Sequence, residues 1–86
     1  MKPSFLLVTC SKDKNLEVVE KIKNNHGIKE ALPVSGIYDC VVRTDDMSYD
    51  EVMELISSSI RPLNDVSLVL PLFTEPPELT NNLGTR

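Results

Sequence analysis

The residues best suited to chemistry lie in one short stretch, residues 33–44, which has the sequence PVSGIYDCVVRT. Gly36 takes a positive φ at little cost, and a tight two-residue turn between paired strands requires such a residue. Asp39 follows this turn near the start of a β-branched run, where a carboxylate has no packing purpose. It either caps turn amides or faces a ligand, and the two roles are compatible.

Few other residues are candidates for catalysis or metal binding. His26 is the only histidine, and it lies at a predicted helix end, where a positive charge is favoured for structural reasons. Cys10 and Cys40 have no CxxC spacing and lie in apolar strand patterns, where a free cysteine behaves as a small hydrophobe. We therefore expect no catalytic residue, no metal site and no cofactor. Free cysteines that pack as small hydrophobes are typical of proteins in a reducing compartment such as the cytoplasm.

Composition excludes several classes of function. The 86 residues make one small domain, and a hydrophobic fraction of 41% argues against disorder. With 9 basic and 13 acidic residues the net charge is -4, and no basic stripe is present, so we expect no direct binding of nucleic acid. The apolar run at residues 5–8 is too short for a signal peptide or a membrane span. We expect a cytoplasmic protein that does not contact membranes.

The first strand and the first helix are expected ahead of the candidate stretch. The continuous apolar run at residues 4–10 predicts a strand that is covered on both faces. Residues 14–25 have the pattern of a short amphipathic helix, with Asp13 as its N-cap and Gly27 as its C′ residue. The apolar side of this helix consists of Leu16, Val18, Val19 and Ile22.

Three more strands complete the domain. Two of them, at residues 28–34 and at about 37–44, flank the turn, and the last covers residues 65–73. The domain is expected to span residues 1–75. Residues 76–86 then form a polar and mobile tail.

The second helix has clear start and stop signals. Ser48 and Glu51 have the spacing of a capping box, and Met47 and Val52 have the spacing of a hydrophobic staple. Apolar residues then repeat at helical intervals until Pro62, which ends the helix because the residue before a proline avoids the helical region.

The resulting β-α-β-β-α-β order predicts an α+β, ferredoxin-like fold, with a four-stranded antiparallel sheet and two helices on one face. Both faces of the sheet are nevertheless apolar. On the last strand, one side is expected to carry Val66, Leu68, Leu70 and Leu72, and the other Val69, Pro71 and Phe73. Exposed apolar faces usually mark association, so we expect a homodimer formed sheet against sheet. The alternative is a loosely covered monomer.

With these elements placed, the chain resembles the effector-binding (RAM) domain of the Lrp/AsnC family of regulators. The resemblance covers residues 4–73, and its most specific part is the pattern V-x-G-x-Y/F-D-x-x-V. The matching segments are FLLV (5–8), GIKEA (27–31), VSGIYDCVV (34–42) and IRPLNDV (60–66).

The resemblance implies a non-enzymatic module of transcriptional regulation that senses a small effector and oligomerises. In that family the domain dimerises through its sheets, dimers assemble into rings, and effectors, typically amino acids, bind between dimers near the hairpin. We expect no helix-turn-helix ahead of the first strand, so the chain resembles stand-alone versions of the domain. Such versions act through partners, for instance full-length Lrp/AsnC-type regulators.

The effector contacts implied by position are those of Ser35, Gly36, Ile37, Tyr38 and Asp39. The first four would contact the charged ends of an amino-acid-like ligand through the main chain. Asp39 would offer a carboxylate to the ligand's ammonium group, which fits the strength of hydrogen bonds between ionised groups. Arg61, after the second helix, is a secondary candidate for an effector carboxylate.

Two other functions use the same order of elements. Dimeric ferredoxin-like domains include small monooxygenases and isomerases, which need a His, Asp or Tyr in a pocket as acid or base. Such an enzyme is the alternative to the sensing module. A metallochaperone is disfavoured because residues 9–12 (TCSK) contain no CxxC.

Overall fold

The strands and helices follow one another along the chain in the predicted β-α-β-β-α-β order. A computed structural model describes residues 2–74. The elements are, in chain order, β1 (Ser4–Cys10), α1 (Asn15–Lys23), β2 (Ile28–Pro33), β3 (Cys40–Thr44), α2 (Tyr49–Leu55), the π-helix η1 (Ile56–Ile60) and β4 (Val66–Phe73). The predicted domain end at residue 75 and the predicted tail at residues 76–86 lie outside the described residues.

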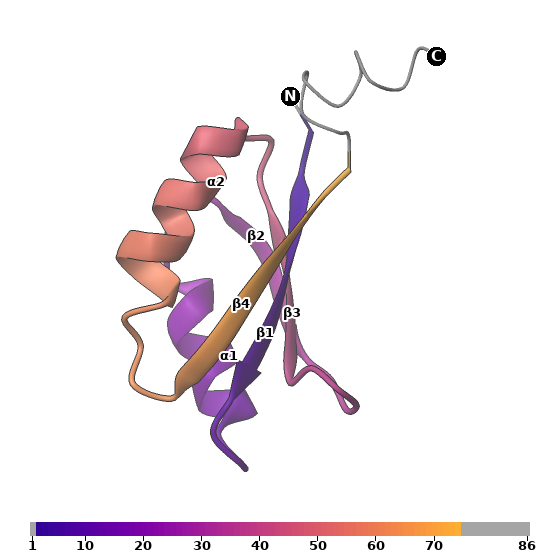
Figure 1. The fold of residues 1–86 in the computed structure, drawn as a ribbon, viewed down its shortest axis with the longest axis vertical. Coiled ribbons are helices and arrows are strands. Elements are labelled where there is room, and N and C mark those ends of the chain that lie inside the picture. The colour runs from indigo at the N-terminus through magenta and orange to yellow at the C-terminus, as the bar shows by residue number, and fades with distance from the viewer. Residues whose placement is uncertain (1, 75–86) are drawn as a thin grey trace.

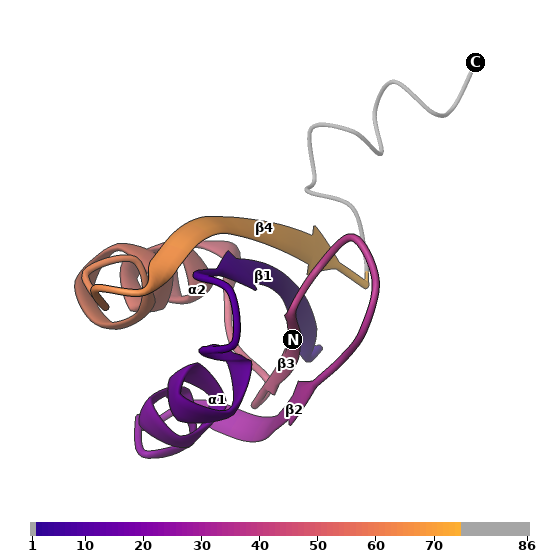
Figure 2. The same ribbon diagram turned by 90° about the horizontal axis from the view of Figure 1, so that it is seen from below.

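The strands form one four-stranded antiparallel sheet in the order β2-β3-β1-β4. Both helices lie on the same side of this sheet, as Figures 1 and 2 show. The predicted α+β, ferredoxin-like arrangement is therefore confirmed. Among residues 2–74, no helix is long and apolar enough to cross a membrane.

The hydrophobic core fills the space between the sheet and the helices. Strand alternation brings every second residue of β1 and β3 to the core side, so that Leu6, Val8 and Val42 are fully buried. The helices complete this core with residues at helical spacing. Their most deeply buried members are Val18, Val19, Ile22, Val52, Ile56 and Ile60.

The second helix starts as the sequence predicts. The hydroxyl of Ser48 accepts a hydrogen bond from the backbone N–H of Glu51 (3.2 Å), and the Glu51 carboxylate accepts one from the backbone N–H of Ser48 (2.8 Å). These two bonds form the capping box. The last turn widens into η1, where the N–H of Arg61 bonds to the carbonyl of Ile56 (2.8 Å). The helix ends before Pro62, as predicted.

The first helix differs from its prediction in three respects. It begins at Asn15 with Lys14 at the N-cap, because Asp13 has a left-handed conformation (φ 65°) and lies outside the helix. Leu16 is 67% exposed, because residues two positions apart on a helix face different sides, and the buried side carries Val18, Val19 and Ile22.

Gly27 was predicted as the C′ residue of α1, but the C-cap is Asn24, so Gly27 lies beyond that position. It belongs to the turn that leads into β2. Its φ of +89° favours glycine, and a Cβ there would come within 2.8 Å of the Met47 side chain.

The connection between β2 and β3 is longer than the predicted two-residue turn. The strands end at the Pro33–Cys40 pair, and residues 34–39 form a loop, here called the β2–β3 loop. The loop is closed by a hydrogen bond from the N–H of Val34 to the carbonyl of Asp39 (2.9 Å). Its glycine, Gly36, has a φ of +147°. The prediction of a tight turn was wrong: the ladder between β2 and β3 ends at the Pro33–Cys40 pair, and the N–H of Asp39 donates to the carbonyl of Val8 on β1 (2.8 Å).

Candidate functional site

The predicted effector contacts all lie on the β2–β3 loop, which projects beyond the sheet in Figure 1. Ser35, Gly36 and Ile37 are exposed, with 87% of Ile37 accessible, while Tyr38 and Asp39 are half-buried. Arg61 is exposed at the end of η1. Within residues 2–74, no hydrogen bond or ion pair links Arg61 to the loop. The structure therefore groups the five contiguous residues and does not join Arg61 to them.

Asp39 fastens the loop to β1 through both its backbone and its side chain. Its N–H donates to the carbonyl of Val8 (2.8 Å), and its Oδ2 accepts from the N–H of Cys10 (2.8 Å). Asp39 thus caps the end of β1, whereas the sequence offered two roles for it, capping amides of its own turn or facing a ligand. Its Oδ1 has no hydrogen-bond partner among the described residues. One carboxylate oxygen is therefore structural and the other is available.

The loop also presents backbone donors. Within residues 2–74, the N–H groups of Ser35, Gly36, Ile37 and Tyr38 donate to no acceptor, in contrast to those of Val34 and Asp39 at its ends. Consecutive backbone N–H groups in a loop can bind an anion. The loop consequently combines free donors with a nearby carboxylate.

The two cysteines lie beside Asp39 and are both free thiols. Burial raises the pKa of Cys40 to about 12, and the neighbouring Cys10 adds to this effect. Burial, followed by the charge of Asp39, also raises the pKa of Cys10. The thiol of Cys40 donates to the carbonyl of Asn15 (3.7 Å). Both groups are therefore protonated at neutral pH, which does not favour a nucleophilic thiolate.

His26 lies far from the loop along the sheet. It is exposed in the turn after α1, where the carbonyl of Gly27 accepts from the N–H of Asp45 at the other end of β3. Within residues 2–74, no group of three or more His, Cys, Asp or Glu residues could hold a metal ion.

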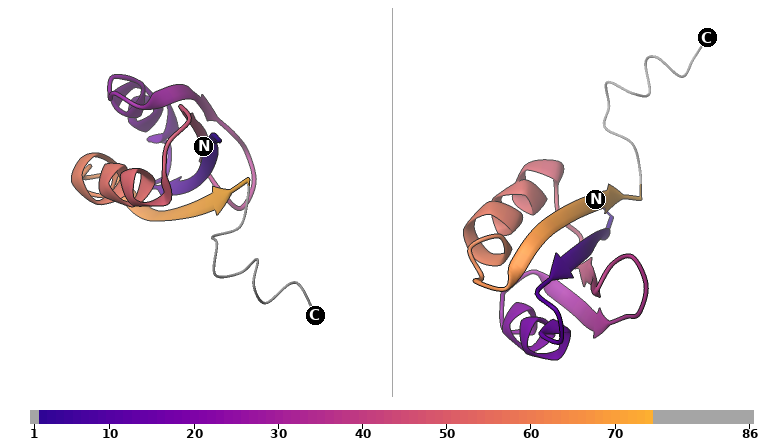
Figure 3. Two further views of the ribbon diagram at one scale, coloured as in Figure 1. Left: turned by 90° about the horizontal axis from the view of Figure 1, so that it is seen from above. Right: turned by 60° about the horizontal axis from the view of Figure 1, so that its bottom comes forward.

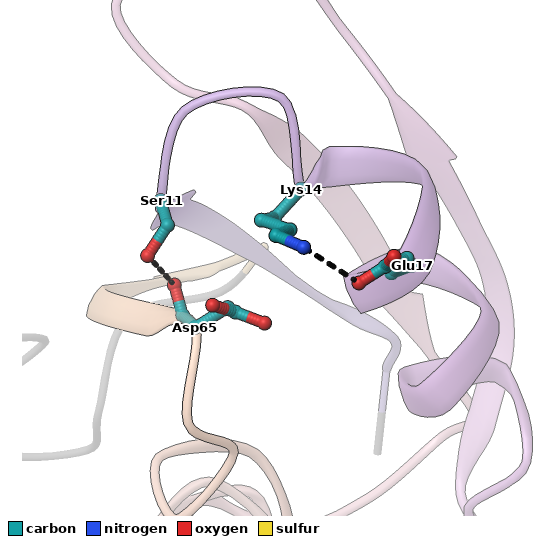
Figure 4. A network of polar contacts seen from close by, with 4 residues as sticks. All are labelled: Ser11, Lys14, Glu17 and Asp65. Carbon is teal, nitrogen blue, oxygen red and sulfur yellow. Dashed lines mark hydrogen bonds and ion pairs between the residues drawn. The ribbon is translucent and has the colours of Figure 1, made fainter.

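A polar network holds the turn between β1 and α1 in place (Figure 4). The carbonyl of Asp65 accepts from the N–H of Ser11 (2.8 Å) and, at 3.5 Å, from its hydroxyl. On the same turn, the ammonium of Lys14 lies 3.6 Å from the carboxylate of Glu17. The sequence carried no signal for the contact between Ser11 and Asp65, because 54 positions separate them. This network joins the end of β1 to the start of β4.

The sheet face opposite the helices, here called the open face, is a second candidate site. Figure 3 shows both helices on the other side of the sheet. The register places Leu32, Val41, Leu7 and Leu70 in one row across all four strands. The exposed leucines of this face, between 39% and 49% accessible, are Leu32, Leu68, Leu70 and Leu72. The predicted second apolar face is confirmed.

One residue was assigned to the wrong face. Val66 was expected beside the leucines of β4, but it packs against the core. A β-bulge between Thr9 and Cys10 shifts the register there, so that Cys10 pairs with Val66 and Thr9 with Leu68. The intervening Ser67 is the extra residue, and its hydroxyl lies 2.9 Å from that of Thr9.

No family model and no curated protein matches the chain. Several solved structures do match it. TTHA0845 from Thermus thermophilus superposes with a TM-score of 0.81 at 21% identity, over 90% of this chain and 96% of that one. FFRP-DM1 superposes with a TM-score of 0.78 at 25% identity, over 87% of this chain and 100% of that one.

A match to a regulator of known family decides the type of fold. Escherichia coli AsnC superposes with a TM-score of 0.77 at 14% identity, over 88% of this chain and 52% of AsnC. The chain has the fold of the Lrp/AsnC regulators. The resemblance noted from the sequence is thus confirmed for the fold, and the chain spans about half the length of AsnC.

Proposed function

We propose that this chain is a non-enzymatic module of transcriptional regulation that senses a small, amino-acid-like effector, self-associates, and acts in the cytoplasm through partner regulators. The observation that carries this proposal is the combination, on the β2–β3 loop, of unbonded backbone N–H groups at Ser35–Gly36–Ile37–Tyr38 with the available Oδ1 of Asp39. The similarity to AsnC supports a role in regulation.

The two ends of an amino acid match this pair of features. Its α-carboxylate suits the N–H groups of the loop, and its ammonium suits the carboxylate of Asp39, because ionised partners make the stronger hydrogen bonds. Gly36 leaves room for close approach, since nothing lies within 4 Å of the place where its Cβ would stand. A side chain at this position would narrow the approach to the backbone.

The positions and protonation of the cysteines and the histidine support a non-enzymatic role. Burial keeps the thiols of Cys10 and Cys40 protonated, and His26 lies at the far end of β3. Acid–base catalysis requires such groups to converge on one substrate. In residues 2–74, the thiols beside Asp39 are protonated, and His26 lies at the opposite end of β3 from the β2–β3 loop.

The open face supports self-association. Its exposed leucines form a connected apolar surface, which a second copy covers when two sheets pack face to face. A domain of this size buries only about 60% of its unfolded surface, so such a partner adds needed stability. The proposed assembly is a homodimer that associates further into a ring of dimers. Its partners include full-length Lrp/AsnC-type regulators.

The test combines light scattering with thermal unfolding in the presence of each of the twenty amino acids. We expect a dimer or larger assembly whose melting temperature rises with one of them. A ligand at 100 times its Kd adds about 2.7 kcal/mol. That corresponds to a rise of roughly ten degrees or more for a domain of this size.

Two variants identify the site. Asp39→Asn keeps an oxygen that can accept from the N–H of Cys10 but removes the charge, so we expect it to fold and to lose the ligand-induced shift. Asp65→Asn is the matched control, because it removes the same charge beside the same end of β1, where Asp65 bonds to Ser11 and Asp39 bonds to Cys10. It should keep the shift. If no amino acid changes the melting temperature, sensing of amino acids is wrong; a monomer contradicts the proposed self-association.

A further inference from the structure

Within residues 2–74, the rows that cross the open face carry one pair of opposite charges among mainly apolar side chains. Glu30 on β2 and Arg43 on β3 are register partners, and both side chains are exposed. The same row continues through Phe5 on β1 to Leu72 on β4. The adjacent row is entirely apolar. Glu30 and Arg43 therefore form a charged corner at the β2 edge of this face.

Neither side chain of the charged corner makes an ion pair within residues 2–74. The ion pairs of this part of the chain both belong to the first helix and its approach, Lys14 with Glu17 and Lys23 with Glu20. The guanidinium of Arg43 and the carboxylate of Glu30 are thus available to another molecule.

Covering the open face with a second apolar sheet creates a problem for these charges. A charged group that loses its water without gaining a partner is strongly destabilising. The other side chains in these rows of the open face are uncharged: they are leucines, Phe5, Val41 and Thr9. The matching charge on a second copy therefore lies at its own charged corner.

We propose that two copies of this chain pair through the open face with their charged corners in contact, so that Arg43 of each copy meets Glu30 of the other. A two-fold interface repeats each contact reciprocally, and one arginine and one glutamate per chain satisfy both contacts. The leucines drive the association, and the charged corner makes it selective for an identical chain and sets the alignment of the sheets. This inference rests on the sheet-to-sheet dimer proposed above.

Charge reversal tests the contact. Glu30→Arg leaves two positive side chains at the corner, and Arg43→Glu leaves two negative ones. Each variant alone should self-associate at least about tenfold more weakly than the unmodified chain, because like charges then face each other. The double variant Glu30→Arg/Arg43→Glu should recover the original affinity.

Mixing gives the sharper result. The two single variants differ in mass, so native mass spectrometry of an equimolar mixture counts mixed and like pairs. We expect the fraction of mixed dimers to be well above the fraction that random pairing would give. Such mixed dimers would also show that both variants fold. The matched controls are Lys21→Glu on α1 and Glu54→Arg on α2, exposed reversals on the helix side of the sheet. These should pair at random and with unchanged affinity.

The remaining outcomes separate the two proposals. Reversals at Glu30 and Arg43 that leave affinity unchanged and give random pairing would place the charged corner outside the interface, which overturns this inference and leaves the dimer standing. An unmodified chain that stays monomeric at all concentrations overturns both the dimer and the charged contact.

Discussion

Replacing Asp39 by alanine should weaken the fold itself, apart from any effect on a ligand. The substitution removes the acceptor of the N–H of Cys10, which lies 2.8 Å from Oδ2. A hydrogen bond to a charged group contributes about 1.5–3 kcal/mol. The bond is only partly buried, so we expect a loss near the lower end, about 2 kcal/mol. Asp39→Asn should lose less, about 1 kcal/mol, because a neutral acceptor remains.

Urea unfolding measures this loss. A small domain has an m-value of about 1 kcal/mol per M, so Asp39→Ala should lower the unfolding midpoint by about 2 M. All variants are compared at one protein concentration, since an associating protein gains stability by mass action. Asp65→Ala serves as the control, because the part of Asp65 that bonds to Ser11 is its backbone carbonyl, which the substitution keeps. It should change stability by no more than about 0.5 kcal/mol.

A midpoint for Asp39→Ala equal to that of the unmodified chain would refute the anchoring role. Equal losses in Asp39→Ala and Asp65→Ala would show that the negative charge at this end of the sheet matters, and that the bond to Cys10 does not. The expected order of stability places Asp39→Asn between the unmodified chain and Asp39→Ala.

Three further predictions concern the core, the open face and the buried thiol. Ile60→Ala should cost about 2–5 kcal/mol in urea unfolding, because Ile60 is fully buried; a loss below about 1 kcal/mol would contradict this packing. Leu70→Lys should reduce the mass seen by light scattering to that of a monomer, while the same change at Leu16, exposed on α1, should not. The free energy of unfolding should fall as pH rises above 9.0, because the Cys40 thiol, with its pKa raised from 9.0 to about 12, stays protonated when folded but ionises when unfolded. In the Cys40→Ala variant, the free energy of unfolding should fall less steeply as pH rises through this range. If the variant and the unmodified chain lose stability in parallel, the pH dependence does not come from Cys40.

Local signals predicted several elements correctly. The first strand was predicted at residues 4–10 and is Ser4–Cys10, because a continuous apolar run of this length favours a strand. Its expected cover on both faces is found on the core side only, since Phe5, Leu7 and Thr9 are half-buried on the open face. The capping box at Ser48 and Glu51 was also correct, since its two hydrogen bonds join residues three positions apart. The order of these elements was enough to identify the fold.

Errors arose where distant contacts decide the geometry. The β2–β3 loop could not be predicted, because the carboxylate of Asp39 bonds to an N–H 29 positions away. The exposure of Leu16 depends on how α1 lies on the sheet. The face of Val66 depends on a bulge between two strands that are far apart in the sequence. The effector contacts and the dimer remain predictions to be tested.

The sequence by itself determined the elements, their order and the two apolar faces of the sheet, because these follow from periodicity and from capping between near neighbours. It also placed the five candidate contacts together, since they are contiguous. Only the tertiary structure decided that one carboxylate oxygen of Asp39 bonds to the N–H of Cys10 while the other stays available. It also decided that Glu30 lies opposite Arg43. Strand register and loop closure bring distant residues together, and no local pattern encodes which pairs will meet.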